Sequence, residues 1–156
     1  MSHIKKKKKV CLISSSGGHY EQLLMLNKLE NNYDVYIITE KTKYNKKKEG
    51  ISYLTQVNRE EKMFIVKFFM VFIQSLYLFF TIKPDIIIST GALACIPMLL
   101  IGKVFSKKVI FIESFAKTNS PTKTGKLMYK YADVFIIQWE SLKTVYPRAI
   151  YLGSVY

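Results

Sequence analysis

The sequence contains few arginines and few acidic residues for its length. Only two of its 24 basic residues are arginine, and 11 acidic residues leave a formal net charge of +13. Specific reading of nucleic-acid bases depends strongly on the forked guanidinium of arginine, whereas lysine acts as a point charge. The composition therefore predicts an anionic partner that is not nucleic acid. A phosphate-rich membrane surface fits best, and a lysine-rich surface without a partner remains an alternative.

Cysteine is also scarce, and no export signal is recognisable. Cys11 and Cys95 are too few for a disulfide framework, and their spacing does not suit a metal site. The lysines at 5–9 precede only four apolar residues, which is too short for the core of a signal peptide. We therefore expect buried, reduced thiols in a cytoplasmic protein that binds no metal.

Apolar runs alternate with helical segments along the chain. Continuous apolar runs are typical of parallel strands that are covered on both faces. Strands are expected at residues 9–14, 33–39, 51–54, 85–89, 108–113, 133–137 and 149–152, and helices at 19–29, 59–82, 94–105, 122–132 and 141–146. This order predicts a single Rossmann-like, doubly wound α/β domain over residues 9–156, after a basic tail at 1–8.

A stretch of small residues, Ser14–Gly18, lies between the first strand and the first helix. Small residues let the backbone approach an anion, and the free N–H groups at a helix start favour phosphate. We predict phosphate or acceptor binding by Ser15, Ser16, Gly17 and Gly18, with the backbone N–H groups of the last three as donors. The G-x-G-x-x-G fingerprint is missing, so no dinucleotide cofactor is expected. A simple tight turn would give the same pattern.

Two other strands also end in small or polar residues. Gly91 and Ala92 follow the fourth strand, and Glu113 and Ser114 lie at the end of the fifth. Because the carboxyl ends of parallel strands meet at one edge, we expect these residues to join the first loop in one site. His19 and Glu113 are the candidates for catalysis. His19 could instead bind phosphate or cap the helix, and Glu113 could bind sugar hydroxyls or a cation, or cap a turn.

The segment 63–82 is apolar at sixteen of its twenty positions. A helix of this length could just cross a hydrocarbon core, but a crossing would separate strands that belong to one sheet. We therefore predict a half-embedded helix at about 60–82, and a buried core helix or a true span remain alternatives. The residues expected in the membrane are Phe68, Phe69, Phe72 and Phe79. Nearby lysines would add electrostatic attraction to an anionic leaflet.

The second half of the chain carries the most specific motifs. These are Ile112-Glu113-Ser114, Thr124-Gly125-Lys126, the run 133–139, Tyr146-Pro147 and Tyr151-Leu152-Gly153. With the glycine loops, they resemble the N-terminal half of a GT-B glycosyltransferase. A closer resemblance is to the membrane-anchoring subunit of the split UDP-N-acetylglucosamine transferase of the dolichol pathway. Bacterial relatives of that subunit serve capsular and exopolysaccharide assembly.

The resemblance implies a subunit that binds the acceptor and recruits its partner to the cytoplasmic face of the membrane. The partner would be the donor-binding subunit, which holds a UDP-sugar, and the acceptor a polyprenyl-pyrophosphate saccharide. The resemblance also places partner contacts near the C-terminus, at Tyr151, Leu152 and Val155. Two alternatives remain open at this point, namely a stand-alone nucleotide- or phosphate-binding protein and a membrane scaffold without enzymatic function.

Overall fold

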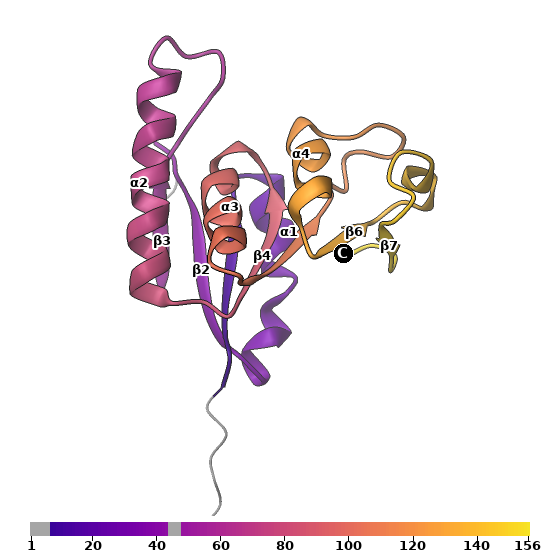
Figure 1. Ribbon diagram of the computed structural model, residues 1–156, viewed down its shortest axis with the longest axis horizontal. Helices are drawn as coiled ribbons and strands as arrows, with labels where there is room; N and C mark the ends of the chain where they lie inside the picture. Colours follow the sequence, from indigo (N-terminus) through magenta and orange to yellow (C-terminus); the bar gives the residue numbers. More distant parts are fainter. Residues whose placement is uncertain (1–6, 44–47) are drawn as a thin grey trace, which may run out of the picture.

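A computed structural model describes residues 7–43 and 48–156 (Figure 1). Most of the predicted basic tail, 1–6, and part of the lysine-rich stretch at 41–48 lie outside the described residues. Seven parallel strands form one sheet in the order β3-β2-β1-β4-β5-β6-β7. The strands are β1 Lys9–Ser14, β2 Asp34–Lys41, β3 Ile51–Thr55, β4 Ile86–Gly91, β5 Lys108–Ile112, β6 Val134–Ile137 and β7 Ile150–Tyr151. Every predicted strand is present, with shifts of up to two residues at the ends.

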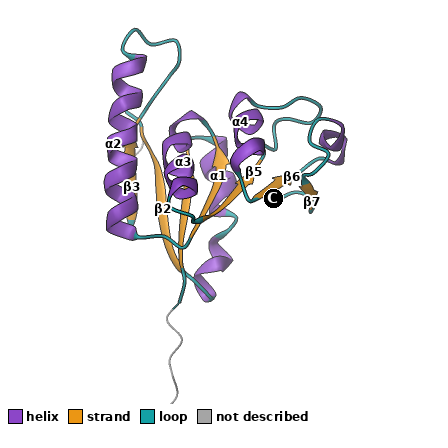
Figure 2. Ribbon diagram, viewed as in Figure 1, coloured by secondary structure: helices purple, strands orange, loops and turns teal. Residues whose placement is uncertain are grey.

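Helices cover both faces of the sheet (Figures 1 and 2). The α-helices are α1 Gly18–Leu24, α2 Phe64–Ile82, α3 Ile96–Val104 and α4 Lys123–Tyr131, and the 3₁₀ turns are η1 Asn27–Asn31, η2 Leu93–Cys95 and η3 Glu140–Thr144. Apolar side chains of α2, α3 and α4 form the larger core on one face. Leu23 of α1 and neighbours from η1 form a smaller core on the other face. This is the doubly wound arrangement that the sequence predicts.

Two helices are shorter than expected by about five residues, and the helix expected at 141–146 is the 3₁₀ turn η3. The helix expected at 19–29 ends at Leu24 and continues as η1, where Asn27 and Asn31 favour turns because their side chains compete for backbone hydrogen bonds. The helix expected from residue 59 begins at Phe64. Asn58 Oδ1 accepts a hydrogen bond from the Glu60 N–H at 3.2 Å, and this side-chain turn precedes the helix.

Helix α2 has one buried face and one exposed face. Val71, Ser75, Phe79 and Ile82 face the core, at helical spacing. Phe79 is only 4% exposed, and its ring centroid lies 5.2 Å from that of Phe105. The prediction that Phe79 inserts into a membrane is therefore wrong, because the packing of α2 against α3 fixes it inward. Phe68 is half-buried against the same core, whereas Phe69 and Phe72 are exposed.

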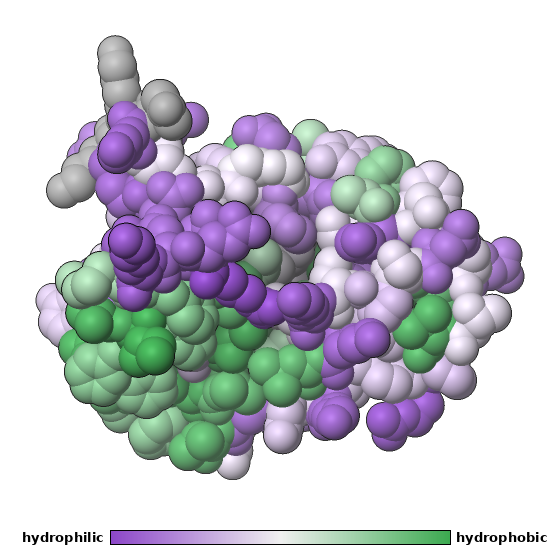
Figure 3. Space-filling model, turned by 90° about the horizontal axis from the view of Figure 1, so that it is seen from above, coloured by the Kyte–Doolittle hydropathy of each residue, from purple (hydrophilic) through white to green (hydrophobic). Residues whose placement is uncertain are grey.

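The exposed face of α2 is strongly apolar. It presents Ile65, Val66, Phe69, Met70, Phe72, Ile73, Tyr77 and Phe80. Figure 3 shows a broad hydrophobic surface on the side of the molecule where α2 lies. By length and composition α2 could cross a membrane, and 22% of its most apolar window is buried inside the protein. The helix nevertheless connects β3 to β4 of one sheet, on which its inner face packs.

Candidate functional site

The loops after β1 and β4 meet at the carboxyl edge of the sheet. The Ser15 N–H donates to the Gly91 carbonyl oxygen at 2.8 Å. Gly91 has φ 99°, and a Cβ there would lie 3.2 Å from His19 Cε1, so both the backbone and the close approach favour glycine. The structure thus brings His19 and Gly91 together as the sequence suggests, with Ala92 next in the chain.

His19 is held in one orientation by the end of β4. Its Nδ1 lies 2.6 Å from the Thr90 carbonyl oxygen, and Thr90 Oγ1 donates to the His19 carbonyl oxygen at 2.7 Å. Because a carbonyl oxygen can only accept, Nδ1 carries the proton of the neutral ring. The lone pair is then on Nε2, which can accept a hydrogen bond or a proton.

The backbone donors of the first loop are not equally available. The Ser15 N–H is bonded to Gly91, and the Ser16 N–H donates to Glu40 Oε2 at 3.2 Å. The prediction that the Ser16 N–H binds phosphate is therefore wrong, because a buried carboxylate already occupies that donor. Within residues 7–43 and 48–156, the exposed Gly17 and Gly18 have N–H groups without a hydrogen-bond partner.

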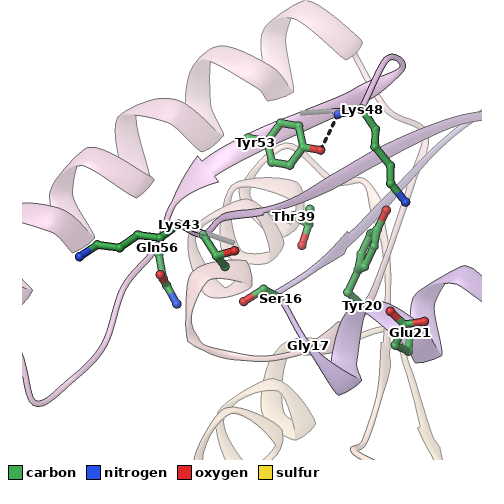
Figure 4. Close-up of a pocket in the computed structure, with 10 residues that line it drawn as sticks. Ser16, Gly17, Tyr20, Glu21, Thr39, Lys43, Lys48, Tyr53 and Gln56 are labelled. Carbon is green, nitrogen blue, oxygen red and sulfur yellow. Dashed lines mark hydrogen bonds between the residues drawn. The ribbon is translucent and has the colours of Figure 1, made fainter. Parts of the chain in front are cut away.

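A cavity of about 630 Å³ opens beside this loop (Figure 4). It is lined by Ser16, Gly17, Tyr20, Glu21, Thr39, Thr42, Lys43, Lys48, Tyr53 and Gln56. Thr39 is 3% exposed, and its Oγ1 is buried without a hydrogen-bond partner among the described residues. Sequence reasoning missed Thr39 and Tyr53, although they are register partners in the neighbouring strands β2 and β3. Pairing these two strands in parallel would have found them.

Glu113 lies in the interior, not at the open edge where the sequence places it. It is 0% exposed. Its Oε1 accepts from the Ser114 N–H at 2.9 Å and from Thr122 Oγ1 at 2.8 Å. Its Oε2 accepts from the Thr122 N–H at 3.2 Å and from the Tyr146 hydroxyl at 2.7 Å. Proton transfer by Glu113 would require these bonds to break, and Ser114 is itself 7% exposed.

The surroundings of Glu113 are closely packed. A Cβ at Gly125 would lie 2.0 Å from Glu113 Oε2, so only glycine fits beside the carboxylate. Burial raises the pKa of Tyr146, and the hydrogen bond to Glu113 raises it further. Tyr146 therefore stays a neutral donor at physiological pH, and the cluster joins the end of β5 to the start of α4.

The cysteines are buried, as expected, and neither forms a disulfide. Burial raises the pKa of both Cys11 and Cys95 to about 12, so the thiols stay protonated and unreactive. Among the residues with described positions, His, Cys, Asp and Glu form no group of three that could hold a metal ion.

The C-terminal segment is partly exposed and partly tied to the domain. Tyr151 is 42% and Leu152 is 72% exposed. Val155 instead packs against the smaller core, and its N–H donates to Gln138 Oε1 at 3.1 Å. The Val155 side chain thus contacts its own sheet and is only partly exposed, and its role as a partner contact stays a prediction. Gln138 Nε2 also donates to Gln22 Oε1 of α1 at 3.0 Å.

The parallel sheet with small-residue loops at its carboxyl edge defines a Rossmann-like domain of the GT-B type. Acinetobacter baumannii MurG aligns with a TM-score of 0.68 and 15% identity, over 86% of this chain and 42% of MurG. The UDP-N-acetylglucosamine 2-epimerase of Rickettsia bellii aligns with a TM-score of 0.73 and 12% identity, over 96% of this chain and 45% of the epimerase. These likenesses concern the fold, and the chain spans less than half the length of either protein.

Residues 10–155 match the family described as "Oligosaccharide biosynthesis protein Alg14 like", and the chain belongs to this family. It is 28% identical over 177 residues to the human UDP-N-acetylglucosamine transferase subunit ALG14. This alignment covers 94% of this chain and 82% of the human protein. The Schizosaccharomyces pombe subunit of the same name is 38% identical over 77 residues, which cover 46% of this chain and 37% of that protein.

Proposed function

We propose that the chain is the acceptor-binding and membrane-recruiting subunit of a two-chain glycosyltransferase. Membership of the Alg14-like family makes it a glycosyltransferase subunit. In this proposal the partner subunit holds a UDP-sugar, and the acceptor is a polyprenyl-pyrophosphate saccharide of capsular or exopolysaccharide biosynthesis. The observation that carries the proposal is the family match over residues 10–155, together with the alignment of 94% of the chain with the human ALG14 subunit. This combination favours a subunit over a stand-alone phosphate-binding protein or a scaffold.

The loop after β1 supports binding of the acceptor. The N–H groups of Gly17 and Gly18, which have no partner in the described part of the chain, can donate to a pyrophosphate oxygen. His19 stands beside them with Nε2 as its proton acceptor. In sugar transfer, a hydroxyl oxygen of the acceptor attacks the anomeric carbon of the donor, UDP leaves, and the hydroxyl proton passes to a base. We assign that role to Nε2 of His19, and to Glu113 the positioning of the start of α4.

Membrane recruitment is assigned to the exposed face of α2. Phe69, Phe72 and Tyr77 are exposed on a chain with a net charge of +13. Apolar insertion combined with basic attraction supplies two signals, which stable peripheral binding needs. We place this surface on the cytoplasmic face of the cell membrane, where a nucleotide sugar is available.

Partner docking is assigned to the C-terminal segment. Tyr151 lies on the edge strand β7, and the neighbouring Leu152 is the most exposed apolar side chain of the segment. An edge strand with exposed apolar neighbours is a surface on which a second chain can pair. Val155 contributes indirectly, because its contact with the smaller core holds the segment in place.

Two matched aspartate variants test this assignment with the full chain and its donor-binding partner. Leu152→Asp should lower recovery of the partner in co-purification by about tenfold, and sugar transfer with it, while vesicle binding stays unchanged. Ile65→Asp on α2 should weaken vesicle binding and leave partner recovery unchanged, since Ile65 is 80% exposed. Equal partner recovery with Leu152→Asp refutes the docking role. Full transfer activity of the isolated wild-type chain refutes the two-chain proposal itself.

A further inference from the structure

The polar cavity beside the first loop adjoins an apolar groove. This groove, of about 400 Å³, lies between the edge strand β3 and helix α2, and it is lined by Tyr53, Ile73, Gln74, Tyr77 and Leu78. Tyr53 also lines the polar cavity. Two spaces, one lined mostly by polar residues and one lined almost entirely by apolar groups, therefore share one wall, the side chain of Tyr53.

The groove is apolar although it contains a glutamine. Gln74 Oε1 accepts from the Thr55 N–H at 2.8 Å, and Gln74 Nε2 donates to Thr55 Oγ1 at 3.0 Å. Both polar atoms of the Gln74 side chain are thus bonded to β3. Ile73 and Tyr77 are 48% and 69% exposed, so the groove opens toward the exposed apolar face of α2.

The opposite side of Tyr53 is polar and carries positive charge. Lys41 Nζ lies 5.4 Å from the centroid of the Tyr53 ring, and the Lys48 N–H donates to the Tyr53 hydroxyl at 3.0 Å. In Figure 4 the Lys48 side chain extends toward the hydroxyl of Tyr20, whereas that of Lys43 points away. Thr39 supplies an independent sign of a ligand, because its buried hydroxyl has no hydrogen-bond partner among residues 7–43 and 48–156, and such a hydroxyl is costly unless something bonds to it.

We infer that one amphiphilic ligand crosses the edge strand at Tyr53, with its anionic head in the polar cavity and the start of its hydrocarbon chain in the groove. The inference rests on the proposed function, and it gives the lipid-linked acceptor a path. The saccharide lies toward His19, the pyrophosphate lies between Gly17 and Lys48, and the prenyl chain passes Tyr53 toward α2. Along this path each part of the ligand meets protein groups of matching polarity.

Direct binding to the full chain tests this path without the partner subunit. The probes are inorganic pyrophosphate, farnesyl diphosphate and farnesol, measured by titration calorimetry at low concentration. Farnesyl diphosphate should bind about tenfold more tightly than pyrophosphate, because burial of even a few carbon atoms supplies that factor. Farnesol should bind more weakly than farnesyl diphosphate, since it lacks the anionic head.

Two asparagine variants on α2 test where the hydrocarbon chain of the ligand binds. Ile73→Asn in the groove should remove the tenfold advantage of farnesyl diphosphate and leave pyrophosphate binding unchanged. Phe69 is 64% exposed and is not among the residues lining the groove. Phe69→Asn should therefore keep the tighter binding of farnesyl diphosphate. Equal binding of the two diphosphates by the wild type overturns the groove assignment, as does an unchanged advantage in Ile73→Asn. Failure of both diphosphates to bind overturns the whole path, whereas the proposed function is judged separately by partner recovery and sugar transfer.

Discussion

The carboxyl edge of the sheet has two halves that use similar residues in opposite ways. In the half formed by the ends of β1 to β4, the Gly17 and Gly18 N–H groups and Thr39 Oγ1 have no partners among the described residues, and a cavity opens beside them. We call this the open half. In the half formed by the ends of β5 and β6, the Glu113 carboxylate accepts four hydrogen bonds and is fully buried. We call this the closed half.

The difference separates residues that stabilise the domain from residues that are free to bind a ligand. A buried carboxylate that accepts bonds from Thr122 and Tyr146 holds distant parts of the chain together. Unpartnered donors beside a cavity have their bonding capacity left for something outside the chain. Substitutions in the closed half should therefore change stability, and substitutions in the open half should change activity.

The largest effect is expected from a methyl group in the closed half. Gly125→Ala places a Cβ 2.0 Å from Glu113 Oε2 and 2.8 Å from Thr122 Oγ1. Such overpacking should cost about 3 kcal/mol of unfolding free energy and lower Tm by about 10 °C in thermal unfolding. Gly18→Ala is the matched control, because its Cβ meets nothing within 4 Å. Similar Tm values for the two variants would show that the closed half is not tightly packed.

A larger side chain in the open half should affect activity alone. Gly18→Val is preferable to a change at Gly17, whose φ of 79° strains any side chain. The added side chain would stand where we place the pyrophosphate, so sugar transfer by the reconstituted pair should fall about tenfold. The Tm of the variant, measured by thermal unfolding, should lie within about 2 °C of that of the wild type. Undiminished transfer would remove the loop from the acceptor site.

The smallest effect is expected from Tyr146→Phe, which deletes one hydrogen bond to Glu113. It should cost about 1.5 kcal/mol of unfolding free energy at neutral pH, measured by urea unfolding. Because the pKa of Tyr146 is raised in the folded state, its stabilisation is complete below about pH 10, its unfolded pKa, and declines above it. The difference in unfolding free energy between wild type and variant should therefore become smaller at alkaline pH. A difference in unfolding free energy that does not change with pH would contradict the raised pKa of Tyr146.

The sequence predicts the sheet well because each strand is a local apolar run. The run 10–13 is read as a strand without reference to the rest of the chain, and β1 spans Lys9–Ser14. The open half is predicted only in part. That His19 and Gly91 lie together follows from parallel strand order, but the Ser16 N–H is taken by Glu40, which stands 24 positions away.

The closed half and the face of α2 depend on packing that the sequence pattern does not encode. Glu113 is buried because Thr122 and Tyr146 converge on it from 9 and 33 positions away. Helix α2 is apolar on nearly every side, so its periodicity cannot distinguish Phe69 from Phe79. Contact with Phe105 of the next helical segment decides that Phe79 points inward.

Helix α2 also determines how the molecule would rest on a bilayer. As the crossover between β3 and β4, it runs antiparallel to the strands, and its first turn lies near their carboxyl ends (Figure 1). When this helix lies flat in the interface, the strands also run along the bilayer, and the carboxyl edge faces sideways. The donor-binding partner that we propose, where it faces that edge, would then stand beside this domain on the same membrane. The acceptor could thus reach the reaction centre by lateral diffusion, with its hydrocarbon chain never leaving the leaflet.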